Sequence, residues 1–294
     1  MRAIRRLLGC VSVLVLCALA AVPAQAASEG HGYLGLGDSV AFGFNPLVDP
    51  SNASNFTGYS ESVAQTLNIE DVNAACPGEA TGGFISLQGL DNVCRPYRAA
   101  FPLHVSYTSA QLDFATNFLA NNPRTRLVTL NLGANDIFKL QKICSTAVDP
   151  AACFNGNLPT FLANMDANLR TIFATIRGTG YTGLIVALTY YALDYRDTSG
   201  AVLLNNPMID AASHFGVLIA SGLEAWRPDA MAVGGSSCAA GLLIPLPPPP
   251  LGPGGCDVHP TPKGRDLLAA AIVNTIAASC PAESPIGCLN RNRA

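Results

Sequence analysis

The chain has 294 residues, of which 49% are hydrophobic and 13% charged, and its formal net charge is −3 at pH 7. With 17 basic against 20 acidic side chains and no basic cluster, it lacks the electrostatic footprint of a nucleic-acid-binding protein. No nucleic-acid partner is therefore expected, and the length suits one α/β domain.

The first 26 residues have the pattern of a secretory signal peptide. Three arginines among the first six residues precede an apolar run at 7–22, and Ala24-Gln25-Ala26 forms a small-residue cleavage site. We therefore expect cleavage near Ala26 and a secreted mature domain of residues 27–294. No later segment has the roughly 18 uninterrupted apolar residues of a membrane helix, so no transmembrane segment is expected.

The first strand of the mature chain is expected at 33–37, and it ends in a glycine-rich turn. Gly37-Asp38-Ser39 closes this apolar run and places a small hydroxyl nucleophile at the strand end. Asp38 is expected to be a hydrogen-bonding residue of the turn rather than an acid in the chemistry. Taken alone, the tripeptide would equally describe an N-capped helix after a strand.

A second motif of the same design follows the strand expected at 127–132. The apolar run leads into Gly133-Ala134-Asn135-Asp136, a turn in which Asn135 offers an amide donor. Taken alone, Asn135 and Asp136 would be interpreted as an Asx turn.

The third motif, Asp257-Val258-His259-Pro260, supplies an imidazole. Thr261 is typical of a helix N-cap and Pro262 of the first helical position, so His259 is expected on a loop held by a helix start. Nucleophile, amide donor and base therefore all lie at the ends of expected elements.

Strands and helices alternate through the rest of the chain. Alternation of this kind predicts a parallel sheet with helices on both faces and function at the carboxyl ends of the strands, where the motifs lie. Further strands are expected at 69–75, 184–190 and 230–233, and helices at 58–67, 108–121, 158–177, 205–225 and 263–278.

Eight cysteines remain after removal of the signal peptide, and an even number in an exported chain predicts disulfides. No pair has the spacing or the histidine partners of a zinc site, so no metal is expected. Spacing does not prove the connectivity, but sequential pairing would close four local loops. These pairs would be Cys76–Cys94, Cys144–Cys153, Cys238–Cys256 and Cys280–Cys288.

The Cys238–Cys256 loop would hold a proline-rich stretch, Pro245 to Pro253, beside His259. Such a run favours a stiff polyproline conformation. It suits an apolar wall of a substrate site and a surface spacer equally well.

Taken together, the motifs resemble those of the SGNH hydrolases, also called GDSL esterases and lipases. That family has, in chain order, a serine in a Gly-Asp-Ser block, a glycine in a second block, an asparagine in Gly-x-Asn-Asp and a histidine in an Asp-x-x-His-Pro-like block. Ser39, Asn135 and His259 match the first, third and fourth residues, and Gly78 is the best match to the second. The resemblance covers about 33–278 and implies a three-layer α/β/α sandwich with a central parallel sheet.

The resemblance implies a serine esterase or lipase that needs no cofactor. A serine hydroxyl is a weak nucleophile, so a neutral imidazole, here that of His259, must take its proton. The oxyanion of the tetrahedral intermediate would be bound by the backbone amides of Ser39 and Gly78 and by the side chain of Asn135. We expect a monomer acting on a small-molecule or lipid ester.

One departure from the family pattern concerns the third catalytic residue. The usual acid lies three residues before the histidine, but position 256 is Cys and the nearest acid, Asp257, lies only two before. In an extended chain a spacing of two points both side chains to the same face, which allows Asp257 to reach the imidazole by a bent path. Some members orient the histidine through a backbone carbonyl three residues upstream, the place of the Cys256 carbonyl here. Both alternatives stay open.

A hypothesis from another class is a non-catalytic extracellular ligand-binding protein on the same fold. In that case Asp257 would be misplaced and the site would only capture a ligand. We prefer the hydrolase, because a binding protein has no need for a nucleophile, oxyanion donors and a base together.

Overall fold

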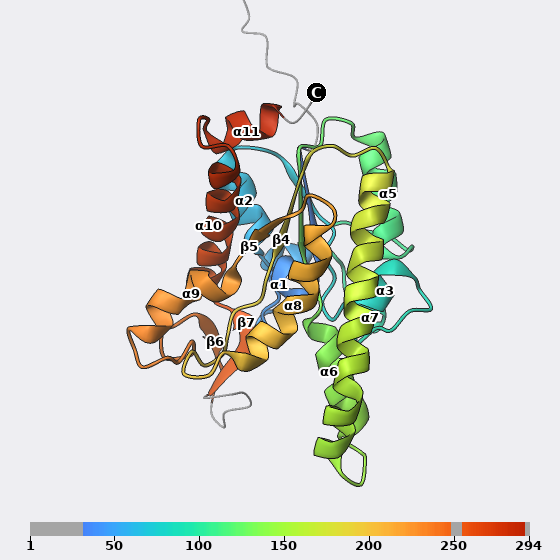
Figure 1. Ribbon diagram of the computed structural model, residues 1–294, viewed down its shortest axis with the longest axis vertical. Coiled ribbons are helices and arrows are strands. Elements are labelled where there is room, and N and C mark those ends of the chain that lie inside the picture. Colours follow the sequence, from blue (N-terminus) through green and yellow to red (C-terminus); the bar gives the residue numbers. More distant parts are fainter. Residues whose placement is uncertain (1–31, 248–254, 292–294) are drawn as a thin grey trace, which may run out of the picture.

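The computed structural model describes residues 32–247 and 255–291 (Figure 1). The expected signal peptide and most of the proline-rich stretch lie outside these residues. In the part of the chain that is described, no helix is long and apolar enough to span a membrane.

Five parallel strands of the described chain form the central sheet, in the order β2-β1-β3-β4-β5. The three inner strands are mostly apolar and are buried almost throughout, because helices cover both faces of the sheet. Leu34 pairs with Val128, and Val128 pairs with Ile185. The strands are β1 (Tyr33–Gly37), β2 (Asp71–Asn73), β3 (Leu127–Asn131), β4 (Leu184–Leu188) and β5 (Leu218–Ala220).

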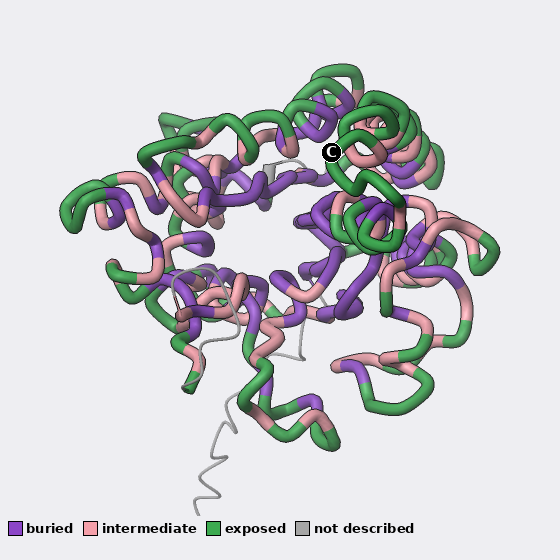
Figure 2. The backbone as a smooth tube through the Cα atoms, turned by 90° about the horizontal axis from the view of Figure 1, so that it is seen from below, coloured by how far each residue is buried: buried purple, intermediate pink, exposed green. Residues whose placement is uncertain are grey.

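Helices cover the two faces of the sheet and divide the core into two apolar clusters. Trp226 and Ile272 belong to one cluster, and Leu112 and Phe173 to the other. Buried segments gather between the helical layers in Figure 2. One layer contains α2 (Tyr59–Leu67), α9 (Gly222–Met231), α10 (Pro262–Ser279) and α11 (Pro285–Arg291), and the other α3 (Thr81–Ile85), α5 (Gln111–Asn121), α7 (Pro150–Gly178) and α8 (Ser199–Ser213). The expected three-layer α/β/α sandwich with a central parallel sheet is confirmed.

Two expectations for the C-terminal half of the sheet are wrong. The helix expected at 205–225 is α8 followed by β5 and the start of α9, and Gly216 lies in the break with a φ of +61°. The strand expected at 230–233 is the end of α9 and a turn that leads to Gly234 and Gly235, both at positive φ. Short apolar runs fit helix and strand alike, so only the pairing of β5 with β4 identifies the edge strand.

A two-stranded antiparallel ribbon lies outside the main sheet, near α9 in Figure 1. It consists of β6 (Leu243–Pro245) and β7 (Cys256–Pro260), with Leu243 opposite Pro260 and Pro245 opposite Cys256. A further feature is the hairpin of α6 (Ala134–Cys144) and α7, which projects beyond the sheet at the lower right of Figure 1.

In the described part of the chain, four disulfides each join one cysteine to the next cysteine along the sequence, and each ties down the end of an element. The first links the loop after β2 to α4 (Cys94–Ala100), and the second joins α6 to α7. The third fixes the first residue of β7, and the fourth ties α10 to α11. The pairs are Cys76–Cys94, Cys144–Cys153, Cys238–Cys256 and Cys280–Cys288.

Candidate active site

Ser39 is the first residue of α1 (Ser39–Phe42), a short helix that begins directly after β1. Gly37 has a φ of +136°, and a Cβ there would lie 2.2 Å from the carbonyl oxygen of Asn131 in β3. Glycine is needed at this close approach, which lets the chain turn from strand into helix. The Asp38 side chain caps the helix by accepting a hydrogen bond from the Val40 amide at 3.0 Å. The serine hydroxyl is thereby fixed at the carboxyl end of a central strand.

The carboxylate of Asp38 is buried and connects three segments of the chain. Besides capping α1, it accepts hydrogen bonds from the Tyr190 hydroxyl at 2.5 Å and from the Asn135 side chain at 3.2 Å. Burial raises the pKa of Asp38 to about 6, although the hydrogen bonds favour the charged form and limit the rise. Asp38 therefore holds the turn after β1 against α6 and against the segment that follows β4.

His259 approaches Ser39 from the antiparallel ribbon, and its Nε2 atom lies 2.8 Å from Ser39 Oγ. The expectation that His259 lies on a loop was wrong, because Cys256–Pro260 is strand β7. The partner strand β6 has only three residues and ends in Pro245, so neither strand has a recognisable pattern of its own. As expected, α10 follows directly, with the Thr261 side chain as its N-cap.

Asp257 lies on the other side of the imidazole. Its Oδ1 atom contacts His259 Nδ1 and also accepts a hydrogen bond from the His259 backbone amide at 3.0 Å. Burial alone would raise the pKa of Asp257, but hydrogen bonds from the His259 side chain and backbone, together with electrostatic attraction to the imidazole, lower it below its ordinary value. The two-residue spacing thus brings the carboxylate to the ring, since side chains two apart on a strand share a face.

Several contacts from other elements hold β7 in place. The Cys238–Cys256 disulfide anchors its first residue. The Tyr191 hydroxyl donates to the carbonyl oxygen of Val258 at 2.6 Å, between Asp257 and His259, and its ring stacks on Trp226 with centroids 3.6 Å apart. The rings of Phe44 and His259 also pack edge to face, with their centroids 5.0 Å apart.

Asn135 lies in the first turn of α6, which begins after Gly133 at a φ of +129°. Its side-chain nitrogen donates to Asp38, and its side-chain oxygen accepts from Asn92 at 3.0 Å. These two contacts fix the orientation of a side chain that is 4% exposed. A primary amide nitrogen carries two N–H groups, so one remains for a ligand.

Gly78 lies in a tight turn after β2. The Cys76 amide donates to the Gly37 carbonyl oxygen at 3.0 Å, so this loop runs alongside the turn that carries Ser39. Gly78 has a φ of +83°, and a Cβ there would lie 2.1 Å from the Val93 side chain. Both the backbone conformation and the close packing therefore require glycine at this position.

The model of the GDSL-like lipase/acylhydrolase family matches residues 36–267, which contain Ser39, Asn135 and His259. The chain belongs to this family. It is a carboxylic ester hydrolase, and the resemblance inferred from the motifs is confirmed. Membership in a family of hydrolases does not favour the non-catalytic binding protein.

Two solved structures show a similar fold. A catalytic mutant of an acetylxylan esterase from Geobacillus stearothermophilus aligns with a TM-score of 0.53 at 15% identity, over 85% of this chain and 95% of that one. A phospholipase A1 from Streptomyces albidoflavus aligns with a TM-score of 0.51 at 17% identity, over 83% of this chain and 99% of that one. At these identities the likeness concerns the fold alone. No curated protein sequence matches the chain significantly.

A cavity of about 370 Å³ opens beside Ser39 in this GDSL-family hydrolase. Ser39, Asn135 and His259 line it, whereas Asp257 and Gly78 lie outside its lining. The remaining walls come mainly from α6, α8 and the segment after β4, and they are largely apolar or aromatic. They include Val40, Phe138, Tyr190, Tyr191, Leu193 and Leu204.

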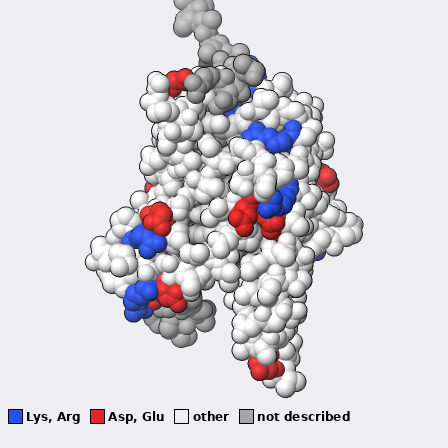
Figure 3. Space-filling view, in the orientation of Figure 1, with Lys and Arg blue, Asp and Glu red and all other residues white. Residues whose placement is uncertain are grey.

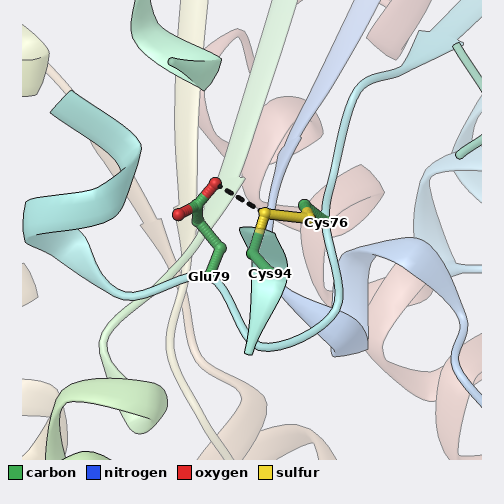
Figure 4. Close-up of side chains that lie close together, drawn as sticks. All are labelled: Cys76, Glu79 and Cys94. Atoms are coloured by element: carbon green, nitrogen blue, oxygen red, sulfur yellow. Dashed lines mark hydrogen bonds between the residues drawn. A yellow bond between two sulfur atoms is a disulfide. The ribbon is translucent and has the colours of Figure 1, made fainter. Parts of the chain in front are cut away.

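Glu79 follows Gly78 and is buried against the Cys76–Cys94 disulfide (Figure 4). Its Oε2 atom lies 3.3 Å from Cys94 Sγ. A disulfide sulfur carries no hydrogen, so this contact is a hydrogen bond when the protonated carboxyl group of Glu79 is the donor. Burial, and then the negative charge of Asp91, raise the pKa of Glu79 to about 8, in agreement with a protonated group at neutral pH.

Cys76, Glu79 and Cys94 lie close enough together to hold a metal ion. Metal binding by cysteine requires the thiolate, however, and both sulfurs are joined in the disulfide. This cluster in the described chain therefore braces the Gly78 loop in the oxidised protein and offers no thiolate ligands.

Sequence reasoning missed Tyr190 and Tyr191, which line the cavity and contact Asp38 and Val258. The available signal was their position. They follow the apolar run of β4 at the carboxyl edge of the sheet, where function was expected, but no motif marks them.

Proposed function

We propose that this carboxylic ester hydrolase works through an acyl-enzyme on Ser39, with His259 as the general base and Asp257 as the residue that orients the imidazole. The observation that carries the proposal is the 2.8 Å distance between Ser39 Oγ and His259 Nε2, together with the contact of Asp257 at Nδ1. Of the two alternatives for the third residue, we prefer Asp257 over the Cys256 carbonyl, because a carboxylate also stabilises the imidazolium that forms.

In the proposed reaction the neutral imidazole keeps its proton on Nδ1, where it is donated to Asp257. Nε2 then takes the proton of Ser39 as Oγ attacks the ester carbonyl, and returns it to the departing alcohol. Water repeats the sequence on the acyl-enzyme and releases the carboxylic acid. The lowered pKa of Asp257 supports this role, because it keeps the carboxylate charged at neutral pH.

We assign the oxyanion of the tetrahedral intermediate to three donors. The Ser39 amide belongs to the first residue of a helix and has no intrahelical acceptor. The Asn135 side chain has one N–H group left after its bond to Asp38. The Gly78 amide would complete the set, because its loop runs beside the Ser39 turn.

The apolar walls of the cavity favour an ester with an apolar acyl group. One structural neighbour is named an acetylxylan esterase and another a phospholipase A1, so the same fold occurs in enzymes named for an acetyl ester and for a phospholipid. We propose an acyl chain longer than acetyl for this protein, because burial of methylene groups against Phe138 and Leu204 stabilises the bound substrate.

We further propose that residues 1–26 direct secretion and that residues 27–294 form one mature domain. Four disulfides support this placement, because they persist in an oxidising compartment such as the extracellular space.

The test is hydrolysis of p-nitrophenyl esters of increasing acyl length by the oxidised mature protein. We expect activity to rise from the acetyl ester to a medium-length ester and to vanish in Ser39→Ala. Ser213→Ala, which changes an exposed serine at the end of α8, is the matched control and should keep full activity. Equal activity of Ser39→Ala and the unchanged protein would contradict the proposal.

A further inference from the structure

Three acidic side chains are buried in the segments that follow strands β1, β2 and β3. On the face shown in Figure 3, several surface charges lie beside side chains of opposite sign. Asp38, Glu79 and Asp136, by contrast, are each no more than 3% exposed. Buried carboxyl groups are costly unless they are hydrogen-bonded, so their partners indicate what they do in the fold.

Two of these carboxyl groups join segments that carry the assigned oxyanion donors. Asp38 accepts a hydrogen bond from the Asn135 side chain at 3.2 Å and so joins the turn after β1 to α6. Asp136 of α6 accepts hydrogen bonds from the amide and the hydroxyl of Thr81, at 2.9 Å and 2.7 Å. Thr81 begins α3, which follows the Gly78 loop, so Asp136 joins α6 to that loop.

Gln111, the fully buried first residue of α5, joins the remaining pair of segments, the Gly78 loop and the turn after β1. The register between β1 and β2 ends at Gly35. Two residues farther on, the Gln111 side chain takes the place of a strand partner. Its Oε1 atom accepts from the Gly37 amide at 2.7 Å, and its Nε2 atom donates to the Gly37 carbonyl oxygen at 3.0 Å. The second N–H group of this nitrogen is directed to Glu79 Oε2, 3.4 Å away.

Glu79 completes this connection because it is the residue after Gly78. A protonated carboxyl oxygen can accept the hydrogen bond of Gln111 and donate its own proton toward the Cys94 sulfur, 3.3 Å away. Burial, and then the charge of Asp91, raise the pKa of Glu79 to about 8, which keeps the group protonated at neutral pH. The contact between Gln111 and Glu79 therefore buries no charge at neutral pH.

We propose that Gln111 and Glu79 are positioning residues for the oxyanion site. They hold the loop of the Gly78 amide against the turn of the Ser39 amide, so that both amides point at one oxyanion. This inference rests on the proposed assignment of these two amides as oxyanion donors. Such donors stabilise the oxyanion only if they are in place before its charge develops. A small shift of the Gly78 loop would lengthen one hydrogen bond to the oxyanion and leave Ser39 and His259 in contact.

The test measures kcat and KM of the oxidised mature protein and its variants on a p-nitrophenyl ester, at a temperature where all are folded. Gln111→Met keeps a side chain of similar length and removes both bonds to Gly37. We expect kcat to fall about tenfold with little change in KM, because the oxyanion forms only after the substrate is bound. Thr129→Val, the matched control, removes a buried hydrogen bond to Tyr33 in the same sheet. It should lose stability and keep its kcat.

Glu79 provides a second set of variants. Glu79→Met breaks the contact with Gln111 and should also lower kcat about tenfold, whereas Glu79→Gln keeps a neutral polar side chain and should retain most of the rate. The double variant Gln111→Met with Glu79→Met should lose little more than either single variant, because both act through one connection. If Gln111→Met does not fold, the comparison of Glu79→Met with Glu79→Gln decides.

Inhibition by phenylboronic acid separates positioning of the oxyanion site from a general loss of structure. A boronate bound to Ser39 is a tetrahedral anion that resembles the transition state and places an oxygen among the oxyanion donors. The inhibition constant should therefore rise in Gln111→Met by about the factor by which kcat/KM falls. In Thr129→Val it should stay unchanged.

Three outcomes would overturn the positioning role while leaving the proposed function in place. The first is an equal kcat in Gln111→Met and Thr129→Val. The second is a loss of activity that appears in KM alone. The third is an unchanged kcat in Glu79→Met, which would remove the connection to the Gly78 loop. Failure of the proposed function has a different signature, because Ser39→Ala would then keep its activity, or the unchanged protein would neither cleave an ester nor bind the boronic acid.

Discussion

The two halves of the proposed catalytic pair are held by different parts of the molecule. Ser39 follows β1, which pairs with strands on both sides in the centre of the main sheet, and Asp38 caps its short helix. His259 lies in a two-stranded ribbon outside that sheet. It depends on one disulfide, on the Tyr191 hydroxyl and on packing against Phe44.

This difference separates folding from catalysis. The nucleophile is positioned by the same buried contacts that stabilise the domain, so changes around it should affect stability as well as rate. The base is positioned by a few local contacts on one side of the cavity. Changes there should therefore lower activity while leaving most of the fold intact.

The largest effect is expected from Asp257→Asn on the histidine side. An amide in this place would favour the wrong imidazole tautomer, and we expect kcat to fall by about 10⁴-fold without a change in the unfolding temperature beyond that of a surface variant. Asp229→Asn, which removes a partly exposed carboxylate from an ion pair with Lys263, is the control and should keep its rate.

A loss of less than tenfold in Asp257→Asn would contradict the assignment of Asp257. The Cys256 carbonyl would then be the orienting group. In that case the double substitution Cys238→Ser with Cys256→Ser should cost more activity than Asp257→Asn.

Asn135→Ala tests a residue that belongs both to the packing around Ser39 and to the cavity, because Asn135 contacts Asp38 and lines the cavity. Removal of one oxyanion donor should lower kcat by about a hundredfold with little change in KM. Asn92→Ala removes only the neighbour that donates to the Asn135 oxygen, so its effect on the rate should be much smaller. Equal losses in the two variants would mean that Asn135 acts through its packing.

Two of the disulfides should also differ in their effect on activity and on stability. The Cys238–Cys256 bond fixes the start of β7, so its replacement by two serines should lower kcat by about tenfold at a temperature where the protein stays folded. Replacement of Cys280 and Cys288 should lower stability and leave kcat unchanged, because this bond ties α10 to α11. Equal activity of the two double variants would mean that the Cys238–Cys256 disulfide does not position His259.

A further expected effect concerns stability on the serine side and its dependence on pH. The pKa of Glu79 is raised to about 8, so the folded protein holds this proton more tightly than the unfolded chain. The free energy of unfolding should therefore fall as the pH rises, by about 2 kcal/mol between about pH 6.5 and 8. Glu79→Gln mimics the protonated side chain and should abolish this fall.

Denaturant unfolding at several pH values provides the measurement. Asp113→Asn, which changes an exposed carboxylate, is the control. Its free energy of unfolding should fall with pH as in the unchanged protein. If the free energy of unfolding of Glu79→Gln still falls with pH, other buried carboxyl groups cause the fall.

The sequence predicted the sheet best where its strands are fully buried. Leu127–Asn131 and Leu184–Leu188 are buried, mostly apolar runs between helices, whereas β5 has three residues at the edge and resembles the adjoining helices. The β6–β7 ribbon was missed for the same reason, because pairing and not periodicity defines it.

The candidate site was predictable as far as motifs mark it. Ser39, Asn135 and His259 stand in short patterns at element ends, and the structure places them around one cavity. No sequence motif indicates Tyr191 or the hydrogen bonds of Asp38, because they depend on the packing of the segment after β4 against distant segments. The geometry of Asp257 likewise requires the strand conformation of β7.

Covalent labelling with an active-site serine phosphonate tests whether Ser39 is the nucleophile. The oxidised mature protein should lose its esterase activity and gain the mass of one adduct, located by peptide mass spectrometry on Ser39. His259→Ala should react far more slowly, because no base would take the hydroxyl proton. An adduct on another serine, or none in a folded and active protein, would mean that Ser39 is not the nucleophile.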